Sequence, residues 1–169
     1  MCPRCGAVTA SVLDADRFAM RLVPNVPPDG GSTDWTDLLD DPRTVRAIFG
    51  EAPSLDQVEL LSIELESWRR EATLHIELPK SAFPIFPPHK WREAGFTRAQ
   101  VILRCWSVRK LEIRGLQHNP IVDLRIEREG ELRRVRAATD EMSLDITADF
   151  LGVTNKDVSA YLHEDDWQE

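Results

Sequence analysis

The sequence lacks the patterns that usually accompany catalysis or membrane insertion. It contains no GxSxG nucleophile setting, no HExxH metal motif and no glycine-rich first turn of a βαβ unit. No apolar run approaches the ~18 residues that a membrane helix needs, and no basic segment followed by an apolar one opens the chain. We therefore expect a cytoplasmic recognition protein that does not bind membranes and is not an enzyme.

Cysteine is also scarce. Three cysteines do not make a disulfide framework, which fits a reducing compartment. Cys2 and Cys5 have the spacing of one zinc knuckle, because two thiolates separated by two residues can share one tetrahedral ion. They supply half of a metal site, while Cys105 lies in an apolar stretch that indicates a core residue. No cofactor is expected, and a zinc-dependent regulatory module built on Cys2 and Cys5 is the alternative.

The charge balance narrows the choice of partner. There are 29 acidic and 21 basic residues, which gives a formal net charge of −8. This charge opposes binding to nucleic-acid phosphates and favours either a basic protein partner or simple solubility. The arginines between Arg125 and Arg136 alternate with Glu127, Glu129 and Glu131, which predicts cross-strand ion pairs on a solvated hairpin.

The length and local composition divide the chain into three parts. The 169 residues suffice for one domain with a real core, and two domains would be crowded. Residues 1–34 contain the two N-terminal cysteines and end in a Pro/Gly/Ser/Asp cluster that is typical of a linker. We expect the folded domain over residues 35–162 and an acidic tail, with little sign of secondary structure, over residues 163–169.

The periodicity within the domain predicts one helix followed by strands. Asp40 or Asp41 before Pro42 marks a helix start, and Gly50 ends that helix. The pattern then changes to a period of two, which predicts a first strand with Leu61, Ile63 and Leu65 facing inward and a second with Leu74, Ile76 and Leu78. Further strands are expected over residues 99–108, 110–115, 121–128, 132–139, 143–150 and 158–162.

These elements predict an α+β fold, a mostly antiparallel curled β-sheet of about eight strands with one short N-terminal helix. The loop from Phe83 to Phe96 joins the second and third strands. The prolines in and just before this loop exclude a central strand there, and one helical turn is expected around Trp91. We expect Trp91 and Trp106 to pack on the sheet.

Several modest motifs, in a fixed order, carry a family resemblance. They are Trp35, DPRTVRAIFGEAPSLDQVELLSIELE, FPPHKWREAGFTRAQVIL, NPIVDLRIE, SLDITADFLGV and VSAYL, and they span roughly Trp35 to Leu162. Together they resemble the bacterial immunity protein 50 family. The resemblance implies an α+β antidote without catalytic residues, which binds a cognate polymorphic toxin stoichiometrically and so neutralises it.

Tryptophan and acidic residues are the candidate contact residues for such a toxin. The negative net charge of the chain favours a toxin with a basic surface. Edge-strand pairing would allow a homodimer as well as a monomer. The proposed contacts are Trp68 in a charged turn, Asp123, and Glu164, Asp165, Asp166 and Trp167 in the tail.

A different function remains as the alternative. The curled sheet could enclose a cavity for a small ligand or an enzymatic site, with His75 or His118 at its mouth. His118 and Asp123 could then form an acid/base pair, although Asn119 and Pro120 more simply predict a turn.

Overall fold

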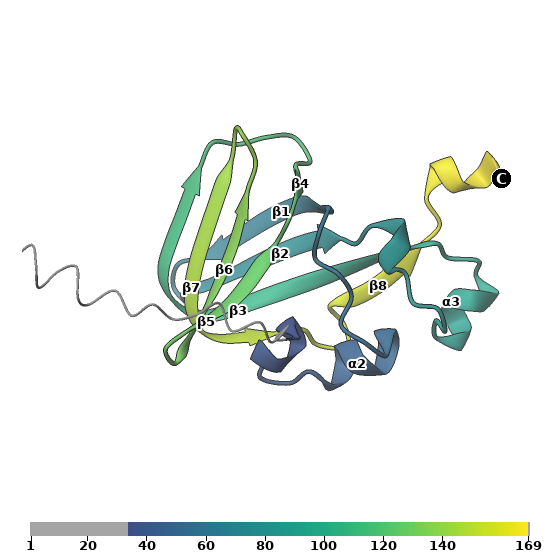
Figure 1. The fold of residues 1–169 in the computed structure, drawn as a ribbon, viewed down its shortest axis with the longest axis horizontal. Helices are drawn as coiled ribbons and strands as arrows, with labels where there is room; N and C mark the ends of the chain where they lie inside the picture. Colours follow the sequence, from purple (N-terminus) through teal and green to yellow (C-terminus); the bar gives the residue numbers. More distant parts are fainter. Residues whose placement is uncertain (1–33, 169) are drawn as a thin grey trace, which may run out of the picture. The chain divides into compact units, whose positions relative to one another are not determined.

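One long strand, β3 (Arg98–Arg114), runs through the centre of the fold (Figure 1). The computed structural model describes residues 34–168. β3 pairs along one edge with β2 (Glu71–Glu77). Its other edge pairs first with β8 (Val158–Tyr161) and then with β7 (Ser143–Gly152). Because β3 contacts three strands, it joins both halves of the sheet.

The strands form one antiparallel sheet of eight strands. Its order is β4-β1-β2-β3-β7-β6-β5, with β8 beside the first part of β3. The predicted fold class is therefore confirmed. The remaining strands are β1 (Val58–Glu66), β4 (Ile121–Val122), β5 (Arg125–Glu129) and β6 (Leu132–Ala138).

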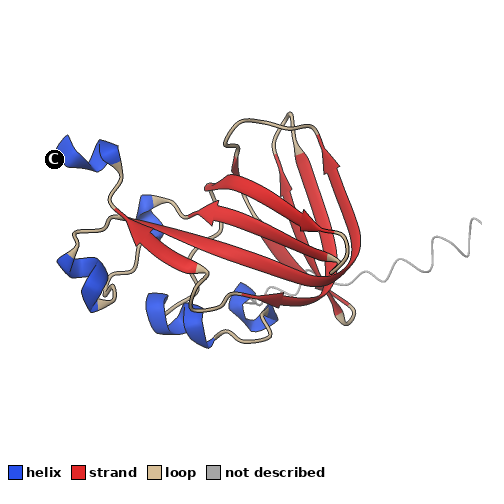
Figure 2. Cartoon of the chain, turned by 180° about the vertical axis from the view of Figure 1, so that it is seen from behind, coloured by secondary structure: helices blue, strands red, loops and turns tan. Residues whose placement is uncertain are grey.

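The sheet curls because its two edge strands are adjacent in sequence. Only Asp123 and Leu124 separate β4, at one edge, from β5, at the other. The Leu124 N–H donates to the Leu55 carbonyl at 2.9 Å, which holds this link against the start of β1. β4 and β5 do not pair within residues 34–168, so the sheet stays open (Figure 2).

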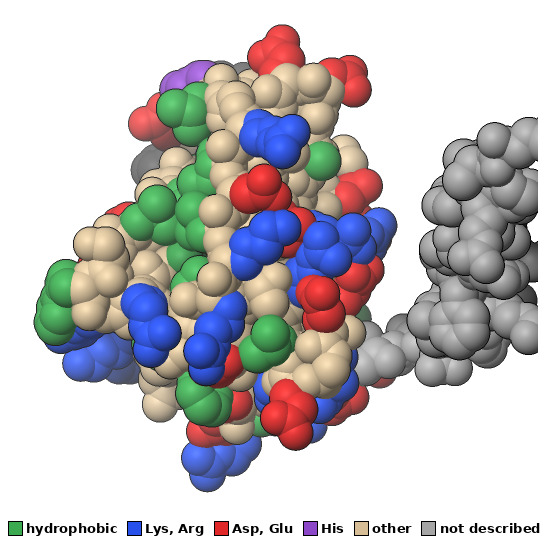
Figure 3. All heavy atoms as spheres, turned by 90° about the vertical axis from the view of Figure 1, so that its left-hand side faces the viewer, with side chains coloured by type: hydrophobic (Ala, Val, Ile, Leu, Met, Phe, Trp, Pro, Cys, Tyr) green, Lys and Arg blue, Asp and Glu red, His purple; other side chains and the backbone are tan. Residues whose placement is uncertain are grey.

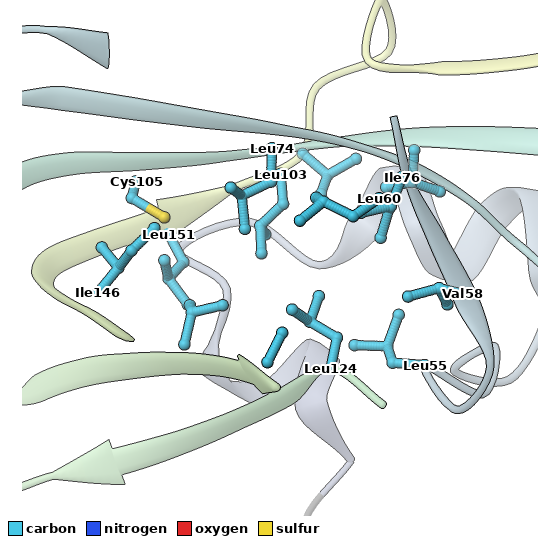
Figure 4. Close-up of a cluster of buried hydrophobic side chains, with 14 of the residues drawn as sticks. Leu55, Val58, Leu60, Leu74, Ile76, Leu103, Cys105, Leu124, Ile146 and Leu151 are labelled. Atoms are coloured by element: carbon cyan, nitrogen blue, oxygen red, sulfur yellow. The ribbon is translucent and has the colours of Figure 1, made fainter. Parts of the chain in front are cut away.

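Side chains from both halves of the sheet fill the concave side. Figure 4 shows Leu74 of β2 and Leu103 of β3 in one cluster with Ile146 of β7 and Leu124 of the β4–β5 link. All four are at most 2% exposed. Burial of each such side chain contributes ~1.5–3 kcal/mol, so this shared core fixes the curl.

The predicted helix and the predicted helical turn both form. α2 (Arg43–Phe49) begins after Asp41, whose carboxylate accepts a hydrogen bond from the Arg43 N–H at 3.1 Å, and ends at Gly50 with φ of +78°. α3 (His89–Glu93) carries Trp91. The short 3-10 helices are η1 (Trp35–Leu38), η2 (Lys80–Ala82) and η3 (Glu164–Gln168).

Two tryptophans hold the chain against the sheet, as predicted. The Trp91 ring lies 6.0 Å from that of Phe83, and both rings pack on the core. Trp106 is half-buried, and its ring fills the space where a Cβ at Gly152 would lie.

Two predicted strand boundaries were wrong. Residues 99–108 and 110–115 were expected to be separate strands, but β3 is continuous because a bulge at Arg109 lets it bend without ending. Residues 121–128 were expected to be one strand. The Leu124 N–H donates to the Leu55 carbonyl instead, so the segment divides into β4 and β5 on opposite edges of the sheet.

The inward face of β1 also differs from the prediction. The register shifts between Leu60 and Ser62, so Leu60 is buried and Leu61 is only half-buried. Ile63 keeps its inward position opposite Leu74. A single extra residue reverses the face on which side chains point, which is why the simple alternation failed.

The turn after β3 provides a test of the fold. Gly115 has φ of +70°, and a Cβ there would lie 2.0 Å from the Glu141 carbonyl oxygen. We expect Gly115→Ala to reduce the free energy of unfolding by about 2–5 kcal/mol, because the left-handed backbone and the main-chain overlap both oppose a side chain. Urea denaturation measures this loss.

Gly130→Ala is the matched control. Gly130 also has a positive φ, +64°, but no atom lies within 4 Å of a Cβ there. Its substitution should cost only about 1–2 kcal/mol, the penalty of the left-handed conformation. Equal losses for the two variants would contradict the close approach of Gly115 to Glu141.

Candidate partner interface

The β1–β2 turn presents a tryptophan to solvent. Trp68 is 76% exposed, as the charged turn predicted, and the Arg69 guanidinium carbon lies 4.3 Å from the centre of its ring. The Val108 N–H donates to the Arg70 carbonyl at 2.9 Å, which fixes the turn beside β3. Trp and Arg often anchor protein interfaces, so this turn is one candidate contact.

An open groove of about 350 Å³ adjoins the turn, between the end of β1 and the bend of β3. Leu65, Val108 and Leu111 supply its apolar lining. Leu65 was expected to be buried. It does lie opposite Ala72, but the groove leaves it 52% exposed. Figure 3 shows the side of the molecule that is on the left in Figure 1, where basic and acidic groups flank a strip of hydrophobic side chains.

Asp123 lies in the link between β4 and β5 and takes part in the fold. Its Oδ1 accepts hydrogen bonds from the backbone N–H and the side-chain amide of Gln57, at 2.9 and 3.1 Å. These bonds hold the pKa of Asp123 below its ordinary value. Asp123 is exposed, so its second oxygen can still meet a partner.

Within the acidic tail, residues 164–168 form η3, although little secondary structure was predicted there. Asp166 accepts hydrogen bonds from Lys80 Nζ at 2.9 Å, Thr97 Oγ1 at 2.5 Å and Arg98 Nε at 3.4 Å, and its side chain is only 8% exposed. Glu164 and Asp165 are exposed. The side chain of Trp167 lies outside the described part.

The predicted contact residues therefore do not form one patch. Trp68 lies at the β1–β2 turn, Asp123 at an edge of the sheet, and η3 beyond the end of β8. Figures 1 and 2 both place η3 and α3 at the same end of the molecule. Sequence reasoning missed the exposed Ile85 and Phe86 near α3, although their bracketing prolines are a readable signal.

Within residues 34–168, the candidate acid/base pair of His118 and Asp123 does not form. His75 alternates with the inward Leu74 and Ile76, and its Nε2 lies 3.3 Å from Glu64 on the opposite face from the core. His118 is exposed and makes no contact with Asp123 in the described structure. Burial raises the pKa of the Cys105 thiol to about 12, with the charge of Glu71 adding to it, so this thiol remains protonated and is a poor nucleophile.

Arg136 and Arg134 pair across the hairpin with Glu127 and Glu129, while Arg125 and Arg133 pair with residues outside it. Arg136 lies 2.6 Å from Glu127 across the β5–β6 hairpin, and Arg134 binds Asp145 of β7 through two nitrogens at 3.0 and 2.6 Å. The cross-strand pairing predicted for this hairpin is confirmed. Paired guanidinium groups are less available to phosphate.

The described residues contain no group of three or more His, Cys, Asp or Glu side chains that could hold a metal ion. Cys2 and Cys5 lie outside them. Within residues 34–168, no helix has the length and apolar character that crossing a membrane requires.

The buried carboxylate of Asp157 gives a prediction about the stability of the fold. Asp157 is 1% exposed and binds Arg104 at 2.9 Å and the Thr154 N–H at 2.8 Å. Burial alone would raise its pKa, but these donors hold the pKa below the ordinary value. We expect Asp157→Ala to cost about 2–4 kcal/mol in the free energy of unfolding, because Arg104 loses its closest partner and the Thr154 N–H and hydroxyl lose their acceptor.

Asp149→Ala is the control for that variant. Asp149 binds Arg109 with similar geometry, at 3.0 and 2.8 Å, but Arg109 is 55% exposed. Water screens this pair, so the loss of unfolding free energy should be much smaller than for Asp157→Ala. Comparable losses in urea denaturation would refute the distinction.

The attachment of η3 should depend on pH. The hydrogen bonds from Thr97 and Lys80 lower the pKa of Asp166 from 3.8 to about 2. The depressed pKa means that the carboxylate stabilises η3 fully above pH ~4, and that this contribution is lost as the pH falls towards ~2. Hydrogen exchange of the Asp166 amide should accelerate relative to that of Leu103 over this window. Asp166→Asn should show the faster exchange already at neutral pH, and unchanged exchange in the variant would disprove the attachment.

Comparison with known protein families identifies the family of this chain. The sequence model of the immunity protein 50 family matches residues 41–159, well over half of the chain. The match lies inside the region that carries the resemblance, so the predicted family is confirmed. No curated protein and no solved structure matches the chain. The chain therefore belongs to the immunity protein 50 family, and this membership implies an immunity protein of a toxin system.

Proposed function

We propose that this protein is a cytoplasmic antidote that binds a cognate polymorphic toxin stoichiometrically and blocks it without catalysis. The family match over residues 41–159 is the observation that carries the proposal. Neutralisation by binding requires only a stable surface that is complementary to the toxin.

The fold supports this mode of action. The shared core and the bent β3 hold the loops on a single sheet, so little conformational entropy is lost when they bind. The Arg70 carbonyl and the Asp166 carboxylate each fix an exposed segment to the body of the fold. Preorganised segments of this kind favour tight binding.

The charge supports a toxin with a basic surface. A net charge of −8 would speed the encounter with such a toxin by long-range attraction. We propose η3 as the main acidic contact, with Glu164 and Asp165 facing the toxin, Asp166 holding the helix in place and Trp167 adding an aromatic side chain. Trp68 and Asp123 define the alternative contact regions.

Co-expression tests the function. The toxin domain encoded immediately beside this chain's gene is expressed with and without the chain, and growth and complex formation are measured. We expect the chain to restore growth and to co-purify with the toxin at a molar ratio of one to one, because stoichiometric blocking requires a stable complex.

A toxin domain from another immunity system is the specificity control, and the chain should not neutralise it. If the adjacent toxin neither co-purifies nor loses its toxicity, the proposed function is wrong. Loss of toxicity with no stable complex would instead point to enzymatic inactivation.

A further inference from the structure

The loop between η2 and α3 exposes two neighbouring apolar side chains. Ile85 and Phe86 are each 87% exposed, the highest values among the large hydrophobic residues in the described part. Single exposed hydrophobic residues are common on protein surfaces, but adjacent ones are less easily explained. This pair contributes little to the core, so we infer that its role is contact with another molecule.

The loop that carries this pair is stiff. Pro84 is buried, and the Phe83 ring before it packs against Trp91. Pro87 and Pro88 follow directly, and a residue before proline is restricted to extended backbone. The backbone of Phe86 is therefore restricted, and Ile85 follows a buried proline, so the loop loses less backbone entropy when a partner binds.

Asp166 clamps both ends of the segment. It binds Lys80 in η2, ahead of the loop, and Thr97 and Arg98, after α3. A single carboxylate of η3 thus ties together the points where the chain leaves and rejoins the sheet. The tail and the loop form one structural unit at this end of the molecule (Figures 1 and 2).

The charges around the loop indicate the chemistry of its partner. Lys90 and Arg92 on α3 are exposed and form no ion pair within residues 34–168. Glu164 and Asp165 on η3 are exposed as well. A complementary surface would have an apolar pocket, carboxylates opposite α3 and basic groups opposite η3.

We propose that Ile85 and Phe86 are the apolar anchor by which this protein binds its cognate toxin, in an apolar pocket of the toxin flanked by charges of both signs. This inference rests on the proposed function and adds the contact surface to it. Asp166 attaches η3 to both ends of the segment that carries the pair, so a toxin bound to the pair would lie at the same end of the molecule as Glu164 and Asp165.

The test is the affinity of the purified chain for the toxin domain encoded beside its gene, measured by calorimetry. For Ile85→Ala/Phe86→Ala we expect the Kd to rise by ~100-fold or more, since two buried anchor side chains are lost. Growth protection should fall accordingly. Both residues are exposed, so the urea midpoint of the free protein should not change.

Trp68→Ala and Leu116→Ala are the matched controls. Trp68 is an exposed aromatic at the β1–β2 turn, and Leu116 is 86% exposed in the loop after β3. Each should change the Kd by less than ~3-fold, the range of contacts near the edge of an interface. Lys90→Glu/Arg92→Glu should raise the Kd, most clearly at low salt, because it places like charges against the carboxylates expected opposite α3.

Each outcome bears on a distinct claim. Unchanged affinity in the double variant, or a large loss only in Trp68→Ala, overturns the anchor while leaving the antidote function intact. If the double variant disrupts a homodimer but not toxin binding, the pair serves a second copy of the chain and the proposal is wrong. A wild-type chain that neither binds nor protects overturns the function itself.

Discussion

The fold depends on the pairing of β3 with three other strands. Up to Cys105 it lies between β2 on one edge and β8 then β7 on the other, and beyond that point only β7 continues beside it. The change falls at Ser107, which has φ of +52°, and at the bulge of Arg109. One continuous strand therefore turns from one half of the sheet into the other, and the core closes between the two halves.

The two ends of β3 have different surroundings because different strands pair with each end. At its bend, β2 has ended and a groove opens beside Trp68. At its beginning, Arg98 pairs with Tyr161 and contacts Asp166, so the proline-rich segment and η3 are both attached there. The segment that precedes the central strand is architectural, as its prolines indicated, and its exposed tip is available for recognition.

The sequence predicted those elements whose pattern is local. Leu74, Ile76 and Leu78 alternate in an undisturbed strand and are all buried, and the helix signals around Pro42 act within a few residues. The sequence pattern did not predict features that depend on contacts between residues far apart in the chain. The shift beside Leu60, the bend of β3 and the division at Leu124 depend on neighbouring strands that no short pattern records. The ordering of the tail depends on Asp166 meeting Lys80 and Thr97 across the fold. The exposure of Trp68 could be anticipated because the tryptophan lies in a charged turn. The exposure of Ile85 and Phe86 was not predicted, although prolines bracket the pair.

The central claim is that this immunity protein binds its toxin through the end of the molecule formed by the η2–α3 loop and η3. Hydrogen–deuterium exchange of the chain, alone and in complex with the adjacent toxin domain, tests it most directly. The claim predicts slower exchange in the complex for Ile85, Phe86, α3 and η3, with no change at the β1–β2 turn. Protection confined to Trp68 and its neighbours would contradict it.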